Sequence, residues 1–256
     1  MKYEVYHPDP ALRPYIQHYW LISGTQEVPE AIQLLPDGGV SLLLNLGEGL
    51  HSSRFGAHRS EGAMIVGAMT HGDSQVLLGE SLLFGITFKP AGFARFHRFD
   101  PLDGIANHVL PFDRSLLPGP DGLLRRSAAQ VDRFYLDRLS HPRYSLVPVL
   151  EDIVRHKGQV RMDELMKRHC TTARQLERQF KRQVGITPKE YIDLTRFNHA
   201  FSIVARHGGE RSLMDIAWEC GYYDHAHLAN AFRKHLGRPP AEFILSDSSK
   251  IALAGA

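Results

Sequence analysis

Short apolar runs separated by turn residues fill the first part of the chain. Gly, Pro, Asp and Ser bound these runs, as in the stretch PDGG at 36–39, and such residues commonly separate strands. The runs cover residues 15–23, 39–47, 63–69 and 81–90. Short strands at this spacing predict a small barrel or sandwich. Residues 90–99 then predict a short helix, because Pro90 suits the first position of a helix.

The pattern changes to a helical period after a break rich in Pro and Gly at residues 116–123. In residues 123–140, apolar side chains recur at the spacing of an amphipathic helix. These side chains are Leu124, Ala128, Val131, Tyr135 and Leu139. The stretch SHPRYS at 140–145 is the predicted domain boundary, and the pattern beyond it is helical throughout.

The chain is therefore predicted to be a multidomain α+β protein. The first domain covers residues 1–141 and includes a linker helix at about 122–140. The second covers residues 142–256. A chain of 256 residues is long enough for two ordinary domains.

An internal repeat is the most informative feature of the second domain. One copy covers residues 162–192 and the other covers residues 213–244. Six pairs share an offset of 52 positions: Leu176 and Leu228, Phe180 and Phe232, Gly185 and Gly237, Pro188 and Pro240, Tyr191 and Phe243, Ile192 and Ile244. Leu165 and Met166 match Ile216 and Ala217 at an offset of 51. The one-residue slip must fall in the intervening turn, because loops accept insertions that packed helices do not.

Each copy is predicted to form a helix, a tight turn and a second helix, which is the form of a helix-turn-helix unit. Thr171 or Thr172 can cap the second helix of the first copy, and Asp224 that of the second copy. Gly221 supplies a permissive backbone in the second turn. Residues 188–209 predict one long connecting helix, of about 30 Å for about 20 residues. One turn of B-DNA is roughly 34 Å, so the connector could hold two reading helices in successive major grooves.

Three stretches of the second domain, TARQLERQF, RFNHAFSIV and MDIAWECGYYDHAHLANAFRKHLGRPPAEF, together resemble the DNA-binding domain of AraC/XylS-type transcription regulators. The resemblance covers roughly the last hundred residues. It implies an all-α domain with two helix-turn-helix units, preceded by a cupin-like small β-barrel with flanking helices that senses an effector. The chain departs from the family pattern at Leu228, where an aromatic residue is usual, and at Asn230, where a basic residue is usual.

The first reading helix is expected to turn Leu176 and Phe180 inward. The opposite side is predicted to face DNA and carries Arg174, Glu177, Arg178, Lys181 and Arg182. Arg174 and Arg178 share a face because they are four positions apart. Arg can bind the O6 and N7 atoms of guanine, and Glu can accept from the N4 atom of cytosine. Lys181 and Arg182 are expected to hold phosphates.

The second reading helix is expected to turn Leu228 and Phe232 inward. The outward candidates for DNA contact are His225, Ala226, Ala229, Asn230, Arg233 and Lys234. Asn230 can read adenine, while Arg233, Lys234 and also Arg238 are phosphate candidates. His225 and His227 point about 200° apart on a helix and cannot chelate one ion. His227 is expected at the edge of the packed face.

Charge and cysteine content agree with this interpretation. The net charge is +2, but residues 151–245 carry 16 Lys and Arg against 12 Asp and Glu. A basic half favours an anionic partner. The two cysteines, Cys170 and Cys220, are too few for a disulfide framework and predict a reduced, cytoplasmic protein. No apolar run approaches the roughly 20 residues of a membrane span, and the N-terminus has no signal-peptide core.

The hypothesis is a transcription regulator rather than an enzyme, with no cofactor and no bound metal. Its partners would be double-stranded DNA, contacted in two adjacent major-groove segments, together with a small-molecule effector, RNA polymerase and a second copy of the chain. Six aromatic residues either line an effector pocket or form plain core: Tyr19, Trp20, Phe84, Phe88, Phe93 and Phe96.

Two alternatives stay open. A metal-dependent cupin enzyme with a degenerate helical tail would need a close His-x-His pair on its strands. The histidines among residues 1–110 that bear on this idea do not form one: His51, His58, His71, His97 and His108. The other alternative is a regulator whose first domain only dimerises and senses nothing.

Overall fold

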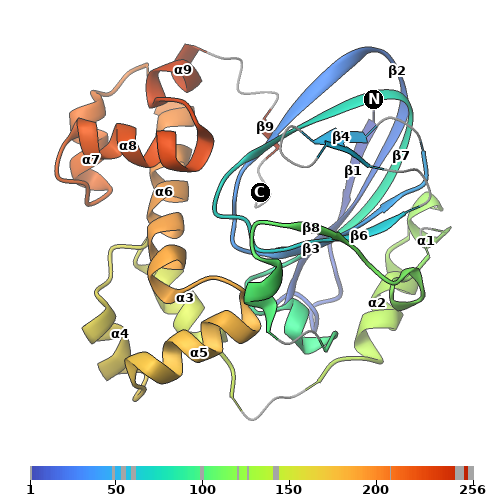
Figure 1. Ribbon diagram of the computed structural model, residues 1–256, viewed down its shortest axis with the longest axis horizontal. Helices are drawn as coiled ribbons and strands as arrows, with labels where there is room; N and C mark the ends of the chain where they lie inside the picture. The colour runs from blue at the N-terminus through green and yellow to red at the C-terminus, as the bar shows by residue number, and fades with distance from the viewer. Residues whose placement is uncertain are drawn as a thin grey trace.

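A sheet-rich part and a helical part make up the computed structural model of the chain (Figure 1). The structure describes residues 2–47, 50–52, 56–58, 62–98, 101–119, 121–125, 127–140, 144–207, 209–245 and 251–252. No helix in these ranges combines the length and the apolar character that crossing a membrane requires.

The sheet contains nine strands within the described residues. Their bounds are β1 Lys2–Tyr6, β2 Ile16–Leu34, β3 Val40–Asn45, β4 Leu50–Ser52, β5 Gly56–His58, β6 Ala63–Val66, β7 Asp73–Phe88, β8 Val109–Pro111 and β9 Ile251–Ala252. The main strand order is β1-β2-β7-β3-β6-β8, and these neighbours are antiparallel. In the described chain β1 and β8 do not pair with each other, so the sheet is not a closed barrel.

Alternation along the strands gives the sheet two buried faces, because successive side chains point to opposite sides. Leu42 and Leu44 join one cluster with Phe84 and Phe88, whereas Leu43 joins a second cluster with Leu83. The four predicted strands are therefore confirmed as β2, β3, β6 and β7. However, β2 and β7 are 19 and 16 residues long and extend well beyond the predicted runs.

The predicted helix at residues 90–99 is wrong. Within residues 90–98, which the structure describes, only a short 3-10 turn forms, η1 Phe93–Arg95. Ala91 has a left-handed backbone, with φ of 63°. Gly92 lies so close to the carbonyl oxygen of Tyr15 that a Cβ atom would be 1.9 Å from it. The backbone is thus held against β2, and an α-helix cannot continue through it.

The single helix predicted at residues 123–140 is also wrong. Two helices replace it, α1 Asp121–Leu124 and α2 Ala129–Leu136. Between them the Ser127 N–H donates back to the Gly122 carbonyl at 2.8 Å, which turns the chain before α2 begins. Val131 and Tyr135 are fully buried as expected, but Leu124 is 47% exposed. Two further 3-10 turns, η2 Leu102–Ile105 and η3 Arg114–Leu116, precede these helices.

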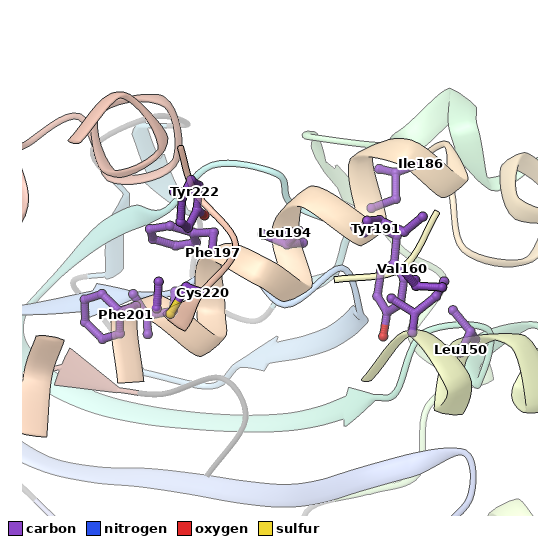
Figure 2. Close-up of a cluster of buried hydrophobic side chains, with 14 of the residues drawn as sticks. Leu150, Val160, Ile186, Tyr191, Leu194, Phe197, Phe201, Cys220 and Tyr222 are labelled. Atoms are coloured by element: carbon purple, nitrogen blue, oxygen red, sulfur yellow. The ribbon is translucent and has the colours of Figure 1, made fainter. Parts of the chain in front are cut away.

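The C-terminal part is helical between residues 147 and 245, as predicted, but β9 lies beyond these helices and pairs with β2 of the sheet. Its elements are α3 Val147–Arg155, α4 Met162–Arg168, α5 Ala173–Gln183, α6 Pro188–His207, α7 Leu213–Glu219, α8 His225–Leu236 and α9 Pro240–Leu245. The long connecting helix α6 spans 20 residues and runs between the other helices (Figure 1). Figure 2 shows its buried side chains, with Tyr191 beside Leu150 and Val160 at one end and Phe197 beside Tyr222 and Cys220 toward the other.

The sheet-rich part packs directly against α6 and α8. Leu35, Ala68 and Ala91 belong to the same buried cluster as the helical core. The amide of Asn198 on α6 donates to the Pro36 carbonyl at 2.8 Å. Gly38 has φ of 73°, and a Cβ atom there would lie 3.2 Å from the Tyr191 ring. The PDGG stretch predicted as a turn therefore also forms part of this domain seam.

His235, near the end of α8, is the buried polar centre of the seam. Its carbonyl accepts from the Gly72 N–H, and its Nδ1 atom lies 2.6 Å from the Thr70 carbonyl. Because a carbonyl only accepts, Nδ1 carries the proton. The ring also stacks on Phe197, with centroids 4.6 Å apart. Burial lowers the pKa of His235 to about 4, so the imidazole is neutral at pH 7.

Replacing His235 by Phe should weaken the fold in a pH-dependent manner. At pH 7.5 the free energy of unfolding should fall by about 1–3 kcal/mol, because the buried Thr70 carbonyl loses its donor. The difference should shrink as pH falls from 6.5 toward 4, because the unfolded imidazole takes up a proton and the folded one does not. Urea unfolding at several pH values measures the difference.

Asp37, whose pKa is raised to about 6 by burial, titrates in the same range but is present in both proteins and cancels. Substitution of the exposed His207 by Phe is the matched control and should change the pH dependence little. A constant difference between wild type and the His235→Phe variant from pH 7.5 to 4.5 would contradict the assignment of a neutral seam histidine.

Candidate nucleic-acid interface

Two helix pairs with the same construction lie toward the two ends of α6 (Figure 1). The first is α4 and α5, and the second is α7 and α8. Helices α4 and α7 are seven residues each, while α5 and α8 are 11 and 12 residues. The repeat found in the sequence is therefore a structural repeat, and α5 and α8 are its equivalent second helices.

Local capping sets where both second helices begin. Thr172 accepts from the Gln175 N–H, while the Gln175 side chain accepts from the Thr172 N–H, forming a capping box. Asp224 accepts from the His227 N–H at 2.7 Å. These are the capping roles predicted for Thr172 and Asp224. Each cap satisfies a backbone donor that would otherwise have no partner within the helix.

Both turns need a left-handed residue, and the two copies supply it differently. Gly221 has φ of 73° in the second turn, and Cys170 has φ of 48° at the equivalent place in the first turn. Glycine adopts this conformation without cost, whereas other residues are strained by about 1–2 kcal/mol. Cys170 is exposed and Cys220 is buried, so the two cysteines do not occupy equivalent environments.

The packed faces of α5 and α8 are those predicted. Leu176, Phe180, Leu228 and Phe232 are all completely buried. Leu228 thus fills its core position although it is smaller than the aromatic residue usual there. Phe232 packs edge-on against Phe197 of α6, with centroids 5.2 Å apart. This packing fixes which sides of the two helices face outward.

The outward sides of both helices carry the predicted candidates. On α5, all five candidates are exposed: Arg174, Glu177, Arg178, Lys181 and Arg182. On α8, five of the six candidates are exposed: His225, Ala226, Asn230, Arg233 and Lys234. Ala229 is half-buried, and Arg238, just beyond α8, is exposed. The sheet-rich part therefore leaves both outward faces open.

Two basic side chains on α8, Arg233 and Lys234, have polar partners within the protein that were not predicted. The Arg233 guanidinium donates to the Asn230 side-chain oxygen at 3.1 Å, so these two candidates form a pair. Lys234 turns toward α6, where its ammonium lies 3.9 Å from the Asp193 carboxylate. His227 lies at the edge of the packed face, as expected, with its ring edge-on to Tyr222 at 5.1 Å.

An ion cluster that sequence reasoning missed supports the first unit. Asp152 on α3 is buried and accepts from Arg168 at 3.1 Å and from His169 at 3.0 Å, at the end of α4. Burial alone would raise the pKa of Asp152, but these hydrogen bonds outweigh it and lower the pKa. The carboxylate therefore stays charged and ties α4 to α3. Asp152 is 16 and 17 positions away from Arg168 and His169 in the sequence, so the pattern of hydrophobic positions does not reveal that they meet.

Four of the six candidate aromatic residues of the first domain pack as core, whereas Trp20 and Phe96 are only partly buried against core clusters. Tyr19, Phe84, Phe88 and Phe93 are all buried in one cluster. His97 is stacked on Phe93 at 4.7 Å, and burial lowers its pKa to about 4. Among the described residues, no three His, Cys, Asp or Glu side chains are grouped so that they could hold a metal ion. The side chain of His51 lies outside the described part of the structure.

The fold and its outward faces define the class: a tandem helix-turn-helix domain joined to a sheet-rich domain. Comparison with known families agrees. Residues 165–245 match a helix-turn-helix domain, and residues 4–111 match a domain of unknown function (DUF6597). Residues 165–245 of this chain are thus a helix-turn-helix domain by sequence as well as by structure.

Similar curated proteins include the HTH-type transcriptional activator RhaS from several Escherichia coli strains, among them E24377A, SE11 and K12 / DH10B. Each is 32% identical over 120 residues. The aligned segment covers 47% of this chain but only 41% of each relative.

Solved structures of ToxT from Vibrio cholerae resemble the chain over most of its length. One covers 90% of this chain and 98% of its own, with 12% identity and a TM-score of 0.46. A second, described as bound to an unsaturated fatty acid, covers 93% and 96%, with 11% identity and a TM-score of 0.49. These values are too low for the two structures to bear on the function of this chain.

Exchanging the two turn residues should have opposite effects on stability. Gly221→Cys should lower the free energy of unfolding by about 1–2 kcal/mol, because a side chain is strained in this conformation. Cys170→Gly should relieve that strain and raise the free energy by up to about 1 kcal/mol. Urea unfolding of the two variants checks both directions. If both substitutions destabilised the protein equally, Cys170 would not be strained in its turn, and the two turns would not be equivalent.

Proposed function

We propose that this protein is a sequence-specific, double-stranded DNA-binding regulator of transcription. One observation carries the proposal: two helices of matched construction, α5 and α8, bury a Leu and a Phe and turn exposed basic and polar side chains outward. In helix-turn-helix proteins, the second helix of the unit lies in the major groove. The excess of basic residues in 151–245 agrees with an anionic partner.

The proposed contacts divide into two kinds. Arg174 and Arg178 of α5, with Glu177, would read bases, because Arg binds guanine through two hydrogen bonds. Lys181 and Arg182 would hold phosphates, which supply affinity but no sequence choice. On α8, His225, Ala226 and Ala229 would approach base edges. Arg233, held by Asn230, would contact the backbone or a base beside it.

The domain seam supports regulation through the first domain. Residues 70–72 bond to His235 on the second reading helix, and Pro36 bonds to Asn198 on α6. A small molecule that shifted residues 68–72 would therefore move α8 relative to the sheet. We propose that effector binding in the first domain changes DNA affinity by this route. The E. coli relatives are named activators. For this chain, we also propose RNA polymerase and a second copy of the chain as binding partners, and the cytoplasm as its location.

Arg178→Ala should weaken binding to a selected operator by about 1–3 kcal/mol and relax the base preference at one position. Lys181→Ala should instead weaken binding to all sequences alike. It should also reduce by about one the slope of the logarithm of the binding constant against the logarithm of the salt concentration. Fluorescence anisotropy with matched and mismatched DNA at several salt concentrations measures both effects.

The control is Arg133→Ala, because Arg133 is an exposed helical arginine on α2, in the sheet-rich domain. It should leave affinity unchanged. The operator is obtained beforehand by selecting fragments bound by the wild-type protein. Unchanged affinity and unchanged base preference for the Arg178→Ala variant would refute the role assigned to that residue.

A further inference from the structure

A contact outside α6 joins the two helix-turn-helix units. Gln159, two residues before the arginine that precedes α4, reaches the turn between α7 and α8. Its side-chain amide donates to the Glu219 carbonyl at 2.9 Å. The Gln159 side chain also packs on Gly221, where a Cβ atom would lie 2.9 Å from its oxygen. Residues 60 positions apart in the sequence are thereby joined directly.

Arg196 reinforces the same contact from the middle of α6. Its Nε atom donates to the Gly158 carbonyl at 3.2 Å, while its guanidinium lies 5.8 Å from the centre of the Tyr222 ring. Arg196 thus contacts the turn that leads into the first unit and the turn inside the second. The side chain is also 3.7 Å from Asp193, one turn earlier on α6.

The backbone of the leading turn is shaped for this approach. Lys157 and Gly158 both have left-handed backbones, with φ of 54° and 68°. Gly158 lies so close to α6 that a Cβ atom would be 2.5 Å from the Arg196 nitrogen and from the Ile192 carbonyl oxygen. Any other residue at 158 would therefore push the turn away from α6. The turn and α6 together form a bracket, which we define as Gly158, Gln159, Arg196, Gly221 and Tyr222.

The bracket restrains the two helix-turn-helix units relative to each other more strongly than α6 alone would. If each unit were attached only through its own end of α6, bending and rocking would let the two reading helices shift relative to each other. A second point of attachment removes that freedom. Each added base pair of B-DNA rotates one half-site by about 35° around the duplex axis relative to the other. Even a small rotation of one unit would therefore change the spacing of half-sites that both reading helices can bind together.

We propose that the bracket, through Gln159 and Arg196, sets the spacing of the two DNA segments that the protein accepts. These residues would select operator spacing without touching a base. The inference rests on the proposed DNA-binding function and extends it to a specificity that base-reading residues do not determine. Gln159 is exposed, so its removal should leave the fold intact.

The test is selection of bound sites from a random DNA pool by the full-length protein. Wild type should enrich two sequence elements separated by one spacing. Gln159→Ala and Arg196→Met should enrich the same two elements, but with spacings spread over at least one base pair on either side. At the wild-type spacing the variants should bind 3- to 10-fold more weakly, as measured by anisotropy.

Arg206→Met is the matched control, because Arg206 is an exposed arginine on α6 that donates to the Ser202 carbonyl within its own helix. It should retain the single wild-type spacing. If Gln159→Ala also retains that spacing, the inference is overturned while DNA binding stands. Enrichment of only one element by wild type overturns it as well. If wild type enriches no sequence, the proposed function itself fails.

Discussion

Burial of α6 on several sides is the constraint on which the rest of the structure depends. Phe197 and Phe201 lie against Phe232 of α8, and Tyr191 lies against Phe180 of α5. Nine of the 20 residues of α6 are buried, and they have to be covered because each exposed large apolar side chain would cost about 1.5–3 kcal/mol. Both helix-turn-helix units and the sheet-rich part supply that cover, so their positions are set together.

The seam and the bracket are polar contacts added to this apolar attachment. Hydrophobic burial is not directional, so it alone would leave each unit some freedom to slide on α6. The bonds from His235 to Thr70 and from Gln159 to Glu219 have defined geometry and restrict that freedom. The first joins the sheet-rich part to α8, and the second joins the turn before α4 to the end of α7. The proposed regulation and the proposed control of spacing therefore involve different contacts.

The sequence predicted the helical part well because local rules decide it. Leu176 and Phe180 are buried since a four-residue interval keeps them on one face, and Thr172 and Asp224 cap because their side chains bond locally. The seam could not be predicted, because its contacts join residues more than a hundred positions apart, such as Thr70 and His235. The helix expected at 90–99 failed for the same reason, since its backbone is held by Tyr15.

Hydroxyl-radical footprinting on a selected operator tests the central claim most directly, namely that two reading helices held by one connecting helix enter adjacent grooves. The account predicts two protected segments on the same face of the duplex, about one helical turn or roughly 10 base pairs apart. One protected segment only, or two segments on opposite faces of the duplex, would contradict it.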